Sequence, residues 1–174
     1  ERDKEVIDGL KDEDGKIYAI PQYEDVLRDV PVMYIRGDWL EDCNLTYPKT
    51  PQELKNVLKV FKEKKGASAS LALSKSYKGP YFTIDRYMLM FGSNPFTWVN
   101  DESGKLVASE TTDNTKKALT YLRDLYSEGL LAPDFASSDP SIVESNIKQG
   151  KTGVIFGPWW QYEYPLADLL PTQD

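Results

Sequence analysis

Four aromatic residues within six positions give the chain its clearest chemical signal. They are Trp159, Trp160, Tyr162 and Tyr164. Flat rings with one polar tip can stack on a ring-shaped ligand and donate hydrogen bonds at its edge. The same rings could instead close the end of a hydrophobic core, because Trp and Tyr bring a large apolar area wherever they lie. The sequence leaves both interpretations open.

Several kinds of catalytic chemistry are excluded by composition. The chain has no histidine and one cysteine, Cys43, so it has no Ser-His-Asp or Cys-His pair and no imidazole zinc ligand. Cys43 cannot form an intrachain disulfide, and a buried or edge thiol is expected. Paired carboxylates remain possible because the chain has 28 acidic residues, but no pair is distinguished by its spacing.

The charge balance argues against two classes of partner. The net charge is −7 and the sequence pI is about 4.8. Nucleic acids and anionic membrane surfaces bind basic faces, so neither is expected as a partner. The chain has no apolar run of membrane-spanning length and no signal-peptide pattern, and it begins without Met. We interpret it as a piece of a longer protein.

The tripeptide Arg36-Gly37-Asp38 occurs in adhesion proteins. Here Trp39 and Leu40 follow directly. Two large apolar residues indicate that this segment packs against a core, and an adhesion or interaction module stays as an alternative.

The elements that would position the aromatic cluster alternate between strands and helices. Thr152 to Phe156 has the composition of a short buried strand, which Gly157-Pro158 ends. Thr50-Pro51-Gln52-Glu53 is a helix start, with Thr50 as the cap and Glu53 completing a capping box, and Gly66 ends that helix. Further strands are expected at 17–20, 32–35 (central) and 69–73, a hairpin at 96–107, and helices at 84–91, 113–129 (capped by Asp113) and 139–150. The fold class is therefore α/β, and the aromatic cluster follows one of its strands.

Four segments resemble the extracellular solute-binding proteins of bacterial ABC importers, in the group that includes maltodextrin- and alginate-binding proteins. Residues 15–21 are similar to the family's G-K-x-Y-x-x-P strand. Residues 34–40 and 48–54 resemble the pattern R-K-D-W-L … P-x-T-x-x-E-L of its lipoprotein-type members. Residues 121–131 resemble L-x-x-L-Y-x-E-G-L-I, and residues 150–160 resemble G-K-x-A … G-P-W.

The resemblance implies an α/β fold that forms one lobe, similar to the C-terminal lobe, of a periplasmic-binding-protein type II fold. Members of the family have two lobes joined by a hinge, with sugar bound between them. By this resemblance, residues 1–24 cross in from a missing N-terminal lobe, residues 25–170 form a C-terminal-lobe-like α/β domain, and residues 171–174 are a truncated end.

The resemblance also implies ligand-binding residues. Trp159 matches the tryptophan of the G-P-W signature, which stacks on a sugar face, and Tyr81 in P-Y-F-T matches an aromatic residue that lines the maltodextrin site. Asp29 lies near the family's acidic residue past the hinge, with Asp25 and Glu24 as rivals. Trp98, Trp160 and Tyr162 are further candidates by their aromatic character and placement.

At two places the sequence differs from the family's pattern, and these differences bear on the expected ligand and on metal binding. Gly79 stands where maltodextrin binders have an acidic residue before Pro80, which argues against maltodextrin. The segment 64–68 is basic and lacks the D-x-D/N spacing of the calcium loop in alginate-type members. No metal and no cofactor are expected.

The expected function is therefore a non-enzymatic binding component that holds an oligosaccharide or similar polar solute between two lobes and delivers it to ABC permease subunits. The resemblance places the protein outside the cell, as a lipoprotein or in the periplasm, with a lipid anchor outside this sequence. A glycan hydrolase with paired carboxylates is the alternative from another class.

Overall fold

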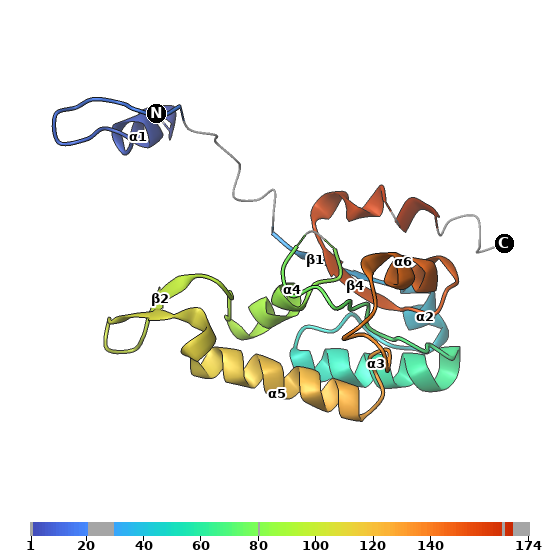
Figure 1. Ribbon diagram of the computed structural model, residues 1–174. Helices are drawn as coiled ribbons and strands as arrows, with labels where there is room; N and C mark the ends of the chain where they lie inside the picture. The colour runs from blue at the N-terminus through green and yellow to red at the C-terminus, as the bar shows by residue number, and fades with distance from the viewer. Residues whose placement is uncertain (1, 21–29, 80, 165, 169–174) are drawn as a thin grey trace.

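The computed structural model describes residues 2–20, 30–79, 81–164 and 166–168 (Figure 1). Asp29 and its rivals Asp25 and Glu24 lie outside the described residues. Within the described ranges, no helix combines the length and the hydropathy that a membrane crossing needs.

The N-terminal part, residues 2–20, contains one helix and one turn. Helix α1 spans Arg2–Asp8. Asp12 then accepts hydrogen bonds from the backbone N–H groups of Asp14 (2.9 Å) and Lys16 (2.8 Å), which stabilise a turn at residues 12–16. The strand predicted at 17–20 is wrong: only an isolated bridge joins Ile17 to Lys11, and Ile20 is 97% exposed. A strand needs a neighbouring strand to take its hydrogen bonds, and no described segment supplies one here.

The sheet that carries the aromatic cluster is small. Strand β1 (Val32–Ile35) pairs antiparallel with β4 (Val154–Gly157), with Val32 opposite Gly157. On the other side of β4, Leu71 forms a parallel bridge with Val154. The strand expected at 69–73 is thus reduced to one bridge, and β4, not β1, is the central element of the described sheet.

Side chains alternate across this sheet and give it two covered faces. Val154 and Phe156 of β4 belong to a core cluster with helices α3 (Pro51–Lys65) and α5 (Asp113–Ser127). Ile155 belongs to a second cluster with helix α6 (Pro140–Lys148). Figure 1 shows α3 and α5 below the sheet and α6 on the other side. The predicted α/β class is confirmed.

Helix α3 forms where its local signals predict it. The Thr50 hydroxyl accepts a hydrogen bond from the Glu53 N–H (3.2 Å), and the helix ends at Gly66 in the left-handed conformation, with φ of 65°. The Glu53 carboxylate accepts from the Lys49 N–H (2.7 Å), one residue before the position of a capping box. The apolar residues that recur at helical spacing form its buried face: Leu54, Val57, Leu58 and Phe61.

The remaining elements match the expected order with small shifts. Helix α5 begins one residue away from the expected cap, because Thr112, not Asp113, is its N-cap. The others are α2 (Gly37–Asp42), α4 (Ile84–Met88), η2 (Leu89–Phe91), β2 (Trp98–Asn100), β3 (Leu106–Ala108), η3 (Ser109–Thr111) and η4 (Trp159–Tyr162). Strands β2 and β3 form the predicted hairpin.

The Arg36-Gly37-Asp38 tripeptide is part of this framework. Arg36 donates to both carboxylate oxygens of Asp38, and these hydrogen bonds lower the pKa of that carboxyl group. The Arg36 guanidinium lies 4.7 Å from the ring centre of Trp39, which is only 7% exposed. The packing interpretation is confirmed, and the adhesion alternative loses its support. Cys43 is a buried free thiol, as expected.

Candidate ligand-binding face

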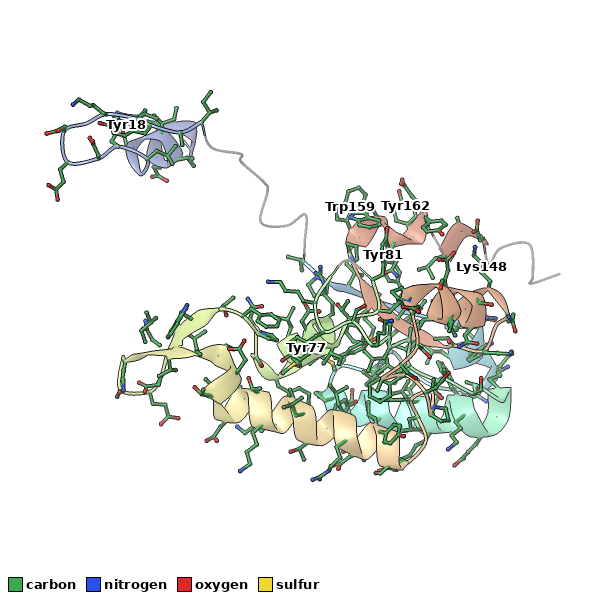
Figure 2. The ribbon with its side chains drawn as sticks, in the orientation of Figure 1. Tyr18, Tyr77, Tyr81, Lys148, Trp159 and Tyr162 are labelled. Atoms are coloured by element: carbon green, nitrogen blue, oxygen red, sulfur yellow. The ribbon has the colours of Figure 1, made fainter. Side chains whose placement is uncertain are left out.

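The chain leaves the central strand β4 through Gly157-Pro158 and enters the short helix η4. We call residues 158–164 the aromatic turn. Trp159 is 49% exposed and Tyr162 is 53% exposed, and their ring centres lie 6.4 Å apart with planes tilted by 35°. Figure 2 shows both rings on the outer side of the turn. These two rings do not fill the core, so each has an open face for a ligand.

A second pair of rings lies beside them. Tyr81 and Trp160 meet edge to face, with ring centres 5.4 Å apart and an interplanar angle of 88°. Both are half-buried. Tyr81 also packs against the second core cluster, together with Tyr34 and Leu166. Four of the six predicted ligand residues therefore form two ring pairs at the aromatic turn: Trp159 with Tyr162, and Tyr81 with Trp160.

The aromatic turn is attached to strand β1 by Tyr34. The Tyr34 hydroxyl lies 2.8 Å from the carbonyl oxygen of Pro158 and 2.6 Å from that of Trp159, so its single proton is shared between them. Burial raises the pKa of the Tyr34 phenol, and a backbone hydrogen bond from Tyr162 partly opposes the rise. The phenol therefore stays protonated and remains a donor at neutral pH.

Gly157 is required at the end of β4 for reasons of space. A Cβ atom at this position would lie 1.4 Å from the Oε1 atom of Gln161. Gln161 is fully buried, and its amide oxygen and nitrogen have no hydrogen-bond partner in the described residues. The Gln161 side chain thus lies directly on the strand backbone, and the turn folds back closely on β4.

The far end of the aromatic turn is attached to helix α6. The Tyr164 hydroxyl donates to Glu144 Oε1 (2.7 Å), and Lys148 forms ion pairs of 2.9 Å with both Glu144 and Asp168. Hydrogen bonding to Lys148 lowers the pKa of Glu144, and hydrogen bonding to Glu144 raises the pKa of Tyr164. The turn is therefore held at both ends.

The exposed phenol of Tyr162 is uncharged and can form hydrogen bonds with a ligand. Tyr162 donates to Glu163 Oε1 (3.0 Å), and this bond raises the pKa of Tyr162. The open face therefore presents an indole and a neutral phenol beside one carboxylate. Such a set can stack on an apolar ring face and exchange hydrogen bonds with hydroxyl groups.

The remaining two predicted ligand residues are Trp98 and Asp29. Trp98 is 69% exposed on the β2–β3 hairpin, which Figure 1 shows apart from η4. Asp29 lies outside the described residues. Their roles stay predictions.

One hollow of the surface, about 690 Å³, is formed by the β2–β3 hairpin and the start of α5, and none of the predicted ligand residues lines it. In the described ranges, no three acidic or cysteine side chains gather as metal ligands would. At the aromatic turn, the rings of Trp159 and Tyr162 are about half exposed.

Tyr34 and Gln161 are the residues that sequence reasoning missed. Tyr34 is in a strand between Met33 and Ile35, and these two pack against the larger core cluster. Strand alternation therefore places Tyr34 on the opposite face, and this was the available signal. Gln161 carried no signal, because a glutamine among aromatic residues in a turn reads as exposed.

An α/β lobe whose central strand ends in an exposed aromatic turn has the architecture of one half of a solute-binding protein. Comparison with known sequences agrees with this class. The profile of the family described as bacterial extracellular solute-binding protein matches residues 2–173. The chain therefore belongs to this family, as the sequence motifs predicted.

Two curated relatives come from Bacillus subtilis. The lipoprotein LipO is 34% identical over 81% of this chain and 29% of its own length. The polygalacturonan/rhamnogalacturonan-binding protein YtcQ is 31% identical over 83% of this chain and 29% of its own length. The chain thus spans less than a third of these two relatives.

A solved structure shares the fold. The Streptococcus pneumoniae substrate-binding protein FusA, in complex with kestose, superposes with a TM-score of 0.67 at 23% identity. The match covers 92% of this chain and 35% of FusA. The chain therefore has the fold of about one lobe of a periplasmic solute-binding protein.

Proposed function

We propose that this chain is one lobe of the extracellular solute-binding component of an ABC importer, and that it binds an oligosaccharide in the cleft between two lobes. The membership in the family and the relatives that bind sugars support this function. Permease subunits would be the partners, and a lipid anchor like that of a lipoprotein would lie outside this sequence.

The half-exposed Trp159 ring carries the proposal. It stands at the end of the central strand, 49% exposed, beside Tyr162. A sugar ring presents a patch of C–H groups, and an indole face covers this patch by dispersion. Such a ring contact contributes about 1 kcal/mol. Trp160 and Tyr81 would line the same side, and Trp98 and Asp29 would add outer contacts.

Polar groups at the edge of the face would orient the sugar. The Tyr162 phenol and the Glu163 carboxylate are exposed and adjacent. A carboxylate accepts hydrogen bonds from sugar hydroxyls, and a phenol both donates and accepts. Closure of the second lobe would complete these contacts and produce the state that the permease recognises.

A binding role fits the carboxyl groups better than a hydrolytic role. A glycosidase needs one carboxylic acid with a raised pKa as its proton donor. In the described part of the chain, every carboxyl group with a displaced pKa has a lowered one; these groups are Asp38, Asp101, Glu128 and Glu144. We propose that the protein is not an enzyme.

The decisive experiment uses the two-lobed protein and a set of sugars that includes kestose and trigalacturonate, chosen from the ligand classes of FusA and YtcQ. Thermal shift finds the binder, and calorimetry measures its Kd. Trp159→Ala should weaken binding, while Tyr47→Ala, which removes a 63% exposed ring from the loop before α3, should not.

Two outcomes would contradict the proposal. One is equal loss of sugar binding in the Trp159 and Tyr47 variants. The other is release of reducing sugar that a single Asp or Glu substitution abolishes. The isolated lobe should bind the same sugar more weakly than micromolar, because half of the contacts are missing.

A further inference from the structure

Tyr34 connects two segments that are far apart in the sequence. Its ring lies on the α6 side of strand β1, packed against the cluster of Ala72, Phe82 and Ile155. Its hydroxyl reaches the carbonyl oxygens of Pro158 and Trp159, which are 124 and 125 residues away. These two carbonyls form the entry of the aromatic turn.

The position of this bond determines what it controls. Pro158 and Trp159 are the residues at which the chain changes from strand β4 to helix η4. A backbone that is hydrogen-bonded at this point has little freedom to rotate. Its orientation therefore determines how the rings of Trp159 and Tyr162 are oriented. Figure 2 shows Trp159 and Tyr162 side by side at this end of the molecule.

The rest of the aromatic turn is also fixed by contacts. Gln161 is packed on the Gly157 backbone, and Tyr164 is bonded to Glu144 on α6. A shift at Pro158 would therefore not spread along the turn but would change the tilt between the Trp159 and Tyr162 rings, now 35°. A sugar face that contacts both rings is sensitive to this angle.

We propose that Tyr34 is a positioning residue for solute binding: its hydroxyl fixes the entry of the aromatic turn and so sets the angle at which Trp159 and Tyr162 meet the sugar. Tyr34 does not itself touch the solute. This inference rests on the proposed function, because it assumes that these two rings contact an oligosaccharide.

The variant that tests it is Tyr34→Phe in the two-lobed protein. Phenylalanine keeps the ring and its packing and removes only the hydroxyl. We expect a loss of about fivefold to tenfold in affinity for the sugar that binds in the screen of kestose and trigalacturonate, because misaligned preorganised contacts are lost together. Melting temperature should change little.

The matched control is Tyr121→Phe. The Tyr121 hydroxyl donates to the carbonyl oxygen of Pro51 over 2.8 Å, which is the same type of bond, at the start of α3 and away from the aromatic turn. A structural role alone would make the two variants equivalent. Under the proposal, only Tyr34→Phe weakens sugar binding.

A second readout needs no sugar. Hydrogen exchange of the backbone amides at 159–163 should become faster in Tyr34→Phe, while the amides of α3 keep their rates. Unchanged exchange at 159–163, or equal affinities for Tyr34→Phe and wild type, overturns the role of Tyr34.

Failure of the proposed function gives a different pattern. If Trp159→Ala leaves sugar affinity unchanged, the rings are not the binding surface, and the proposed function falls. If Trp159→Ala weakens binding and Tyr34→Phe does not, the function stands and the positioning role is wrong.

Discussion

Trp39 and Trp159 show how two regions of one lobe use the same side chain differently. Trp39 is 7% exposed and packs edge to face on Phe61, with ring centres 5.2 Å apart. Trp159 is 49% exposed, and its nearest ring partner is itself half exposed. The core cluster under helices α3 and α5, which includes Trp39 of α2 and which we call the helical layer, buries Trp39 and Phe61, whereas the aromatic turn exposes its rings.

The polar contacts of the two regions also differ: those of the helical layer join helices, and those of the aromatic turn leave its rings exposed. In the helical layer, Glu128 joins the end of α5 to Lys55 (2.5 Å) and Lys59 (2.7 Å) of α3, so its charges connect two helices. In the aromatic turn, hydroxyl groups hold the backbone and leave the ring faces open. The helical layer should therefore determine stability, and the aromatic turn should determine affinity.

The largest expected effect follows from truncating the helical layer. Phe61→Ala removes a ring with 0% exposure that contacts Trp39 and the central sheet cluster. Such a substitution costs about 3–5 kcal/mol, from lost transfer free energy and the cavity left behind. Urea unfolding of the protein followed by circular dichroism measures it. A loss below about 1 kcal/mol would mean that this core collapses around the vacancy.

Trp159→Ala should have the opposite pattern of effects: a loss of sugar affinity without a loss of stability. Sugar affinity should fall about fivefold to tenfold through the lost ring contact, while unfolding free energy should stay within about 0.5 kcal/mol of wild type because the ring is half exposed. Calorimetry and urea unfolding on the same preparation separate the two quantities. A large loss of stability would show that this ring supports the fold and would end the distinction between the regions.

The structure also shows which of these features could be read from the sequence. Helix α3 was predictable because its cap at Thr50, its proline at the first position and its apolar spacing are all local. The exposure of Trp159 was not, because the same G-P-W-W pattern suits a buried plug or an open face. Whether Trp159 is exposed depends on how Gln161 packs on Gly157, and no local sequence pattern predicts that contact.

Failures of the sequence prediction have a common physical cause. Residues 17–20 and 69–73 have strand composition, but a strand is defined by its partner, and one bridge is all that each forms in the described residues. The bond from Tyr34 to residues 158–159 likewise joins segments more than 120 residues apart. Local propensity predicts helices well, but it does not predict strand partners or hydrogen bonds between segments that are far apart in the sequence.

Trp98→Ala tests how far the proposed binding face extends. Trp98 is 69% exposed, but it is on the β2–β3 hairpin and not on the aromatic turn. An outer contact with no surrounding rings should contribute little, so the affinity for sugar should fall about twofold, less than in Trp159→Ala. Calorimetry with the same sugar decides. A loss equal to that of Trp159→Ala would extend the binding face to the hairpin.

The smallest expected effect concerns the charge that joins α5 to α3. Hydrogen bonds from Lys55 and then Lys59 lower the pKa of Glu128, so the unfolded state binds a proton at a higher pH than the folded state does. The stabilisation is therefore complete above the unfolded-state pKa of about 4.3 and is lost as pH falls through the lower folded-state pKa.

Glu128→Gln should make the acid side of the stability curve shallower and leave sugar affinity at neutral pH unchanged. Urea is the denaturant of choice, since guanidinium salt would screen the ion pairs. Glu63→Gln, an exposed carboxylate on the same helix as the two lysines, is the control and should keep the wild-type slope. An unchanged slope in Glu128→Gln would mean that the lysines bind this carboxylate equally in the unfolded chain. The helical layer would then depend on its buried rings alone, and the difference from the aromatic turn would be one of burial and not of charge.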